Sequence, residues 1–109
     1  MSESEKRAIM GAALLEVEDA KAALALLRAK AQNWCRLHEK VAHLLARAMR
    51  DDAHLESAAR DSRVEILGNM PAIAAAMNLD SILALDLELE NALQRLKKAE
   101  TAKRELGFS

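Results

Sequence analysis

The chain has 109 residues, a formal net charge of −1 and a single cysteine, Cys35. This length predicts one domain, and the balanced charge gives no overall preference for nucleic acid or for an anionic membrane surface. Ala and Leu are abundant while Tyr is absent, a composition that favours helix and disfavours sheet. We therefore predict an all-α fold in a single helical domain over residues 1–109. No stretch is typical of a signal peptide or a transmembrane helix, and one unpaired cysteine suits a cytoplasmic location.

The first predicted helix covers residues 3–50 and is long, amphipathic and heptad-patterned. Ser2 and Glu5 match a capping box at its start. With Met10 at heptad position a, the seven-residue register holds for about six heptads along the a and d positions. The predicted oligomer seam, called the heptad seam below, consists of Val17, Ala20, Leu24, Leu27, Ala31, Trp34, His38, Val41 and Leu45. Its first half alternates small with large side chains, so we expect this half either to project or to pack against a second chain.

From Trp34 onward the apolar face of this helix widens, because Cys35 and further Leu, Ala and Met side chains flank the heptad seam. A broad stripe faces more than one neighbouring helix, as in a bundle. We therefore predict that this half lies in a multi-helix core, with Cys35 buried as a reduced thiol. His38 is a polar residue at an a position and is predicted to fix register or oligomeric state, so that His38→Leu would stabilise the assembly.

Asp51 and Asp52 follow the long helix directly. Two acids are unfavourable at a helix C-terminus and favourable at a new N-terminus. We therefore predict a break at this pair and a second helix over residues 52–67. A single unbroken helix to residue 67 is the alternative, because the apolar residues that follow stay in the same register.

The segment from Gly68 to Pro71 is the strongest turn signal in the chain. We expect Gly68 to end the second helix in the left-handed conformation and Pro71 to lie in the first turn of the next. The predicted third helix, residues 71–77, is short and apolar on all sides, so it must be covered.

A second turn precedes the last predicted helix, residues 81–106, with Asp80 or Ser81 as its N-cap. We expect one apolar side of this helix to face the long first helix, and the other side to need cover from the segment 71–77 or from another chain. Leu83 and Leu87 fall on the side opposite its main apolar stripe. We predict that these two leucines form a partner-binding face.

Candidate chemistry is sparse along the chain. Cys35, His38, Glu39 and His43 form the only metal-like set, but the two pairs point to different faces of a helix, whereas a closed site needs three or four convergent ligands. Residues 73–87 resemble a helix-turn-helix in spacing, yet the would-be recognition helix lacks Arg, Lys, Asn and Gln. We predict no catalytic, metal or cofactor site and no membrane partner, and the sequence disfavours nucleic acid as a partner.

The leading functional hypothesis is a non-enzymatic helical module that binds proteins, as an adaptor, assembly factor or inhibitor, and forms a homo-oligomer, most simply a dimer. The long–short–long helix order resembles the architecture of chorismate mutases, in which cationic residues inside an intertwined dimer clamp a dicarboxylate. This resemblance implies an enzyme site between chains, toward which Arg28, Lys40 and Arg47 would point, although the family's spaced arginines on its first helix are not matched. A nucleic-acid-associated helical protein is the third hypothesis and predicts steep salt dependence.

Overall fold

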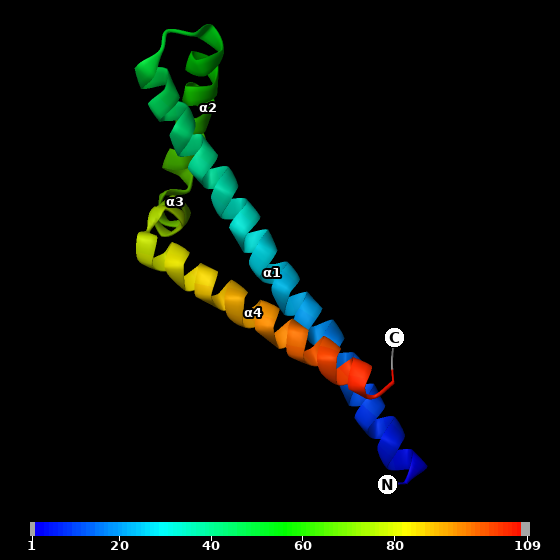
Figure 1. The fold of residues 1–109 in the computed structure, drawn as a ribbon. Coiled ribbons are helices and arrows are strands. Elements are labelled where there is room, and N and C mark those ends of the chain that lie inside the picture. The colour runs from blue at the N-terminus through cyan, green and yellow to red at the C-terminus, as the bar shows by residue number, and fades with distance from the viewer. Residues whose placement is uncertain (1, 108–109) are drawn as a thin grey trace. The chain divides into compact units, whose positions relative to one another are not determined.

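The computed structural model describes residues 2–107, and this part of the chain is all-α with four helices and no strand. Helix α1 covers Glu3–Met49, α2 covers Ala53–Gly68, α3 covers Met70–Met77 and α4 covers Leu79–Glu105 (Figure 1). The predicted fold class and the order of a long, a shorter, a short and a long helix are confirmed. No single helix in the described range is long and apolar enough to span a membrane; α3 and α4 meet those criteria only together, as a pair bent by 69°.

The chain divides into two compact units. One contains Met1–Arg28 and Asp86–Ser109, and the other contains Ala29–Leu85. Helices α1 and α4 therefore each contribute to both units. Each unit is described by itself below, and the prediction of a single domain over residues 1–109 stays a prediction.

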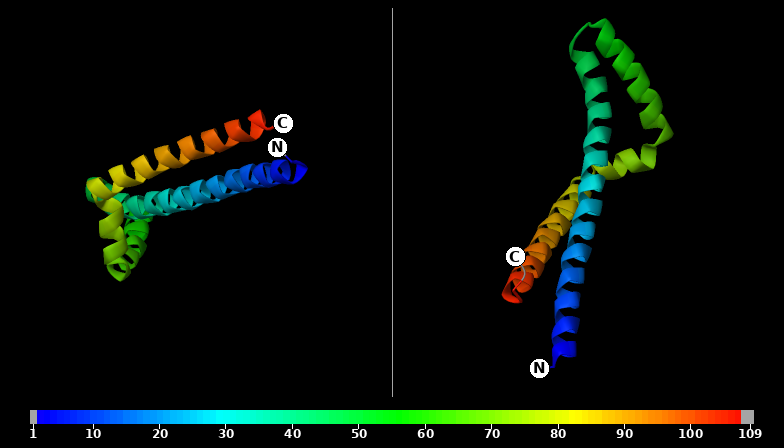
Figure 2. Two further views of the ribbon diagram at one scale, coloured as in Figure 1. Left: turned by 90° about the horizontal axis from the view of Figure 1, so that it is seen from below. Right: turned by 90° about the vertical axis from the view of Figure 1, so that its right-hand side faces the viewer.

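In the first unit, the start of α1 and the end of α4 lie side by side and run in opposite directions (Figure 2). Glu16 Oε1 on α1 accepts a hydrogen bond from Arg95 Nε on α4 at 2.6 Å. The buried residues between these helix segments are mostly small: Val17, Ala20, Leu24, Ala92 and Ala99. Because alanine has only one methyl group, it lets the two backbones approach closely but buries little apolar area.

The second unit has a multi-helix core. Leu37 of α1 packs with Ile73 and Ala76 of α3, and the partly buried side chains of Trp34, Val41 and Ile66 surround this cluster. The widening of the apolar face along α1 therefore coincides with the segment that meets several helices, as predicted. Helix α2 adds Ala59 and Ser62 as its buried residues.

The predicted starts of the first two helices are confirmed by their hydrogen bonds. Ser2 Oγ accepts from the Glu5 amide at 3.1 Å, which caps α1. Asp52 has extended backbone and its carboxylate accepts from the His54 amide at 2.8 Å, which makes it the N-cap of α2. The chain therefore breaks at Asp51–Asp52, and the alternative of one unbroken helix to residue 67 is wrong.

Two predictions about helix ends are wrong. Gly68 is the last residue of α2 and is not left-handed, since Gly107 is the only described glycine with positive φ. The N-cap of α4 is Asn78, not Asp80 or Ser81: its backbone is extended and its Oδ1 accepts from the Ser81 amide at 3.0 Å. An N-cap lies outside the helix and accepts from the second or third helical amide, and of these three residues only Asn78 satisfies both conditions. Pro71 does lie in the first turn of α3, as predicted.

Candidate interaction surface

The heptad seam divides between the two units. Val17, Ala20 and Leu24 are buried and Leu27 is half-buried in the first unit. In the second unit, four later seam residues are half-buried: Ala31, Trp34, His38 and Val41. The last seam residue, Leu45, is exposed. Most of the heptad seam therefore packs within this one chain. Its role as an oligomer seam stays a prediction.

The predicted partner-binding face lies on the exposed side of α4. Leu83 is 57% and Leu87 is 58% exposed, whereas Leu85 between them is buried. At about 100° per residue, Leu87 points away from the side on which Ala92 and Ala99 are buried. This chain therefore leaves the second apolar side of α4 uncovered.

Other large apolar side chains are also exposed. They lie on all four helices and include Leu15, Leu26, Leu45, Met49, Val64, Leu67, Met70 and Leu79. Single exposed leucines are normal on a soluble protein, whereas runs at helical spacing mark contact surfaces. Leu45 with Met49 on α1, and Val64 with Leu67 on α2, have the spacing of neighbours on one helix face.

An apolar groove of about 350 Å³ lies within the second unit. Its lining consists of Ala31, Trp34, Cys35, His38, Ile82 and Leu85. Cys35 is exposed here, so the prediction of a buried thiol is wrong. The reason is that Leu37, two residues further along α1, turns into the core, which leaves Cys35 on the open side. Lys30 Nζ lies 5.1 Å from the centre of the Trp34 ring, in the range of a cation–π contact.

His38 has a specific partner in the second unit. Its Nε2 bonds the main-chain carbonyl of Ala76, in the last turn of α3. Carbonyls in the last turn of a helix have no intrahelical amide to bind. His38 therefore supplies the donor that the end of α3 lacks.

An acid, an imidazole and a hydroxyl also lie in line in the second unit. His43 Nδ1 is 2.9 Å from Ser62 Oγ, and His43 Nε2 is 3.9 Å from Glu39 Oε1. Sequence reasoning missed Ser62, although its position on the inward face of the second helix, between Ala59 and Ile66, is a detectable signal. Ser62 is only 1% exposed, so no substrate can reach its hydroxyl. We interpret the pair as a structural hydrogen bond between α1 and α2.

Charged residues join the same two helices. Glu65 on α2 accepts a hydrogen bond from Arg36 Nη1 on α1, and Lys40 Nζ lies 3.4 Å from its other carboxylate oxygen. The hydrogen bond from Arg36 lowers the pKa of Glu65 below its ordinary value of 4.5, and Lys40 acts in the same direction. The carboxylate therefore stays ionised in the folded chain at neutral pH.

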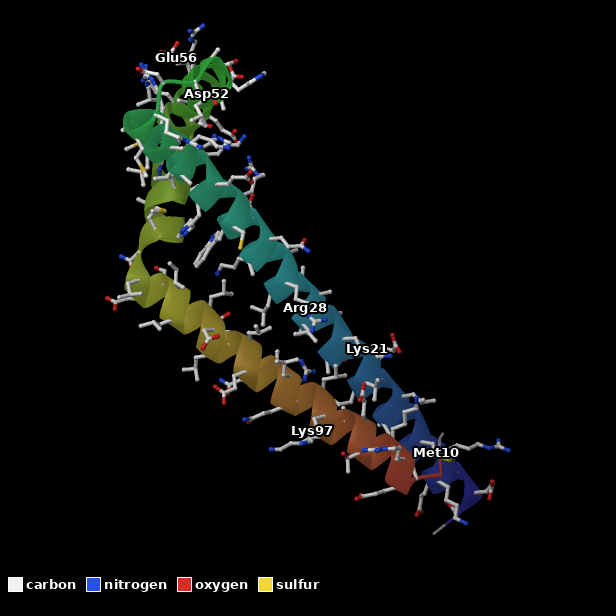
Figure 3. The ribbon with its side chains drawn as sticks, turned by 45° about the horizontal axis from the view of Figure 1, so that its top comes forward. Met10, Lys21, Arg28, Asp52, Glu56 and Lys97 are labelled. Carbon is white, nitrogen blue, oxygen red and sulfur yellow. The ribbon has the colours of Figure 1, made fainter. Side chains whose placement is uncertain are left out.

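The three cations considered for an anion clamp do not converge within a unit. Arg28 is exposed in the first unit (Figure 3). In the second unit Lys40 is paired with Glu65. Arg47 lines a hollow of about 330 Å³ together with Arg50, Asp51 and Glu56 among others. The charges of the two cations and the two acids that line this hollow cancel, so the hollow has no preference for anions.

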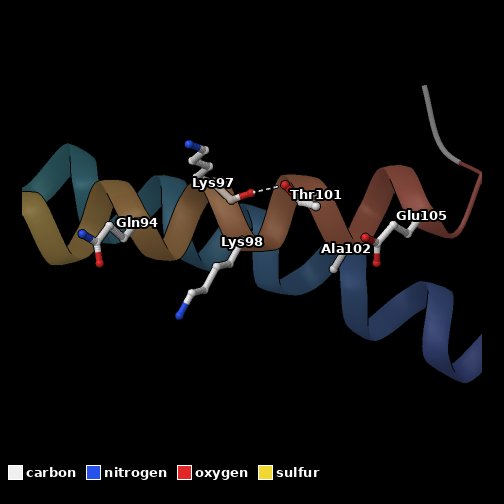
Figure 4. Close-up of a pocket in the computed structure, with 6 residues that line it drawn as sticks. All are labelled: Gln94, Lys97, Lys98, Thr101, Ala102 and Glu105. Carbon is white, nitrogen blue, oxygen red and sulfur yellow. Dashed lines mark hydrogen bonds between the residues drawn. The ribbon is translucent and has the colours of Figure 1, made fainter.

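The hollow of about 420 Å³ on α4 is a surface stripe. Its lining residues all belong to one helix: Gln94, Lys97, Lys98, Thr101, Ala102 and Glu105. Figure 4 shows Lys97 and Lys98 extending away from each other on either side of the stripe. The Thr101 hydroxyl donates to the Lys97 carbonyl at 2.9 Å, so it is already satisfied. One helix cannot enclose a ligand, but such a stripe can contact another helix.

In residues 2–107 no three His, Cys, Asp or Glu side chains are close enough to hold a metal ion. Comparisons of the chain with protein-family models, with curated proteins and with solved structures found no match.

Proposed function

We propose that this chain is a non-enzymatic helical module that binds proteins and assembles with itself, as an adaptor, an assembly factor or an inhibitor of a larger partner. One observation supports this most directly. Among the described residues, fifteen large apolar side chains are exposed, whereas only five are buried. A chain that leaves so much apolar surface in water gains stability when another chain covers it.

The composition of the core supports the same proposal. Half of the ten buried hydrophobic residues are alanines: Ala20, Ala59, Ala76, Ala92 and Ala99. Burying a Leu, Ile or Val side chain contributes about 1.5–3 kcal/mol, and an alanine methyl contributes much less. Ordering each residue costs about 1–2 kcal/mol of backbone entropy. A small chain with such a core is a candidate for stabilisation by oligomerisation.

The cysteine content is the observation behind a cytoplasmic location in this proposal. Cys35 is the only cysteine in the chain, so no disulfide can form within it. Reduced thiols without structural disulfides are typical of reducing compartments.

The proposal is tested by the solution mass of the full chain, measured by light scattering after gel filtration over a concentration series. We expect a dimer or larger species that dissociates on dilution. Circular dichroism at each concentration checks that the helices persist. A monomer at every concentration, with helices intact, would overturn self-assembly.

A further inference from the structure

We propose that the outer face of α4 pairs in antiparallel orientation with the same face of α4 in a second copy of the chain. This inference rests on the proposed function, since it names the second copy as the partner and α4 as the contact. The face, called the α4 outer face below, consists of Asp86, Leu87, Glu90, Gln94, Lys97 and Lys98.

These residues form one continuous surface. At about 100° per residue they span an arc of about 120° on α4, opposite the side that buries Ala92 and Ala99. All six are exposed. Figure 3 shows Lys97 on the side of α4 that faces away from the start of α1. No helix of the first unit covers this face.

The charges on α4 are separated along its length. Between Leu79 and Gln94 there are four acids and no Lys or Arg: Asp80, Asp86, Glu88 and Glu90. From Arg95 to Arg104 there are five cations and one acid. The helix therefore has an acidic first half and a basic second half.

Neighbours within α4 do not balance most of these charges; Lys97 alone on the α4 outer face has an acid, Glu100, three residues away. Asp86 and Glu90 are four residues apart and repel each other, as do Arg95 and Lys98 at a separation of three. No oppositely charged side chain lies three or four residues from Asp86, Glu90 or Lys98 in the sequence. The nearby carboxylate of Glu16 is bonded to Arg95. Three charges of the α4 outer face, those of Asp86, Glu90 and Lys98, therefore have no oppositely charged neighbour on their own helix.

A second copy brings opposite charges together only when the two helices run in opposite directions. An axis of twofold symmetry near residue 92 keeps each residue on its own flank of the contact, so it places Asp86 beside Lys97 of the second copy and Glu90 near Gln94, and each pair occurs twice. It also places Leu87 against the methylene stem of Lys98, which can cover apolar surface while its ammonium stays in water. A parallel pair would instead bring Asp86 against Asp86 and Lys98 against Lys98. Charge complementarity thus selects the orientation.

The test uses two full-length charge-reversed variants, Asp86→Lys/Glu90→Lys and Lys97→Glu/Lys98→Glu. Each alone places like charges at both ends of the antiparallel pair, so we expect its dissociation constant to rise at least about tenfold. An equimolar mixture restores opposite charges at both ends, so the dimer mass should return. The variant with all four changes should also form a dimer. Glu18→Lys/Glu88→Lys is the matched control for Asp86→Lys/Glu90→Lys, since it makes the same change in net charge on other exposed positions, and it should keep the wild-type mass.

The outcomes separate this inference from the proposed function. If the wild type assembles and both charge-reversed variants keep its mass, α4 pairing is wrong while self-assembly stands. If the wild type is a monomer at every concentration, both are wrong. Loss of mass that mixing does not restore overturns the antiparallel pairing. Should a reversed variant lose its helical circular dichroism, Asp86→Asn/Glu90→Gln and Lys97→Gln/Lys98→Gln replace it; an unchanged dissociation constant with an unchanged salt dependence would then overturn the inference.

Discussion

The imidazole of His38 on α1 donates a hydrogen bond to the main-chain carbonyl of Ala76, which belongs to the last turn of α3. Ala76 is fully buried and His38 is half-buried, so water cannot easily replace the lost partner if the bond is broken. This contact gives His38 a role inside the chain, next to the core formed by Leu37 and Ile73.

We expect His38→Leu to destabilise the chain by about 1–3 kcal/mol, because it leaves the buried carbonyl of Ala76 without a donor. The heptad pattern alone predicts the opposite sign, since a Leu at an a position is ordinarily favourable. Urea unfolding at a fixed protein concentration measures the change. His54→Leu, at an exposed position on α2, is the matched control and should change stability by less than about 0.5 kcal/mol. A rise in the unfolding midpoint of His38→Leu would contradict the structural role.

The cap of α2 gives a second prediction. Asp52→Ala removes the carboxylate that accepts from the His54 amide, and we expect a loss of about 0.5–2 kcal/mol in the free energy of unfolding. Asp51→Ala removes the same charge one residue earlier without touching the cap, so it serves as the control. Asp52→Asn should retain most of the stability, because its amide oxygen can still accept. Equal losses for Asp51→Ala and Asp52→Ala would refute the assignment of the cap.

The sequence predicts a helix start correctly where a single side chain marks it within one helical turn. Three residues mark helix starts in this way: Ser2, Asp52 and Pro71. The N-cap of α4 was missed because several polar residues stand next to one another there, and only the backbone decides which of them lies outside the helix. The pattern around Asn78 does not contain that information.

The contacts that build the candidate surfaces are not local. His43 meets Ser62 across 19 residues and His38 meets Ala76 across 38. A heptad pattern says which side of a helix is apolar, but it does not say which helix covers that side. Val17 and Leu24 would show the same spacing whether α4 of this chain or a second copy lay against them, so the heptad pattern by itself cannot distinguish packing within the chain from an oligomer contact.

Acid should weaken the link between α1 and α2. Arg36 and Lys40 lower the pKa of Glu65 in the folded chain below its ordinary value of 4.5. A lowered folded pKa means that the stabilisation is fully present above about pH 4.5 and is lost as pH falls through the folded value. Unfolding measured from about pH 7 to about pH 3 should therefore show Glu65→Gln less stable than wild type at neutral pH, with the difference shrinking in acid. Glu88→Gln on α4 is the control, and a difference for Glu65→Gln that does not depend on pH would contradict the role of its charge.

The packing of the first unit is tested by two leucines that are two residues apart in sequence but differ in burial. Leu24 is 4% exposed and Leu26 is 73% exposed. We expect Leu24→Ala to cost about 2–5 kcal/mol, because it removes apolar burial and leaves a cavity. Leu26→Ala should stay within about 0.5 kcal/mol of wild type when both are unfolded at the same low concentration. Similar losses at the two positions would mean that the first unit does not pack as described.

The α4 outer face gives the last prediction, which separates assembly from folding. Leu87 is 58% exposed and Leu15 on α1 is 61% exposed, so a Leu→Lys change at either position should leave the helical circular dichroism of the chain intact. In the antiparallel pair Leu87→Lys places a second cation against Lys98 and removes an apolar contact, and this occurs twice per dimer. We expect the dissociation constant to rise at least about tenfold, as measured by light scattering over a concentration series. Leu15→Lys adds the same charge and removes a side chain of the same size outside the α4 outer face, so it should keep the wild-type mass. If Leu15→Lys dissociates the chains and Leu87→Lys does not, the contact lies on α1 and the assignment to α4 is wrong.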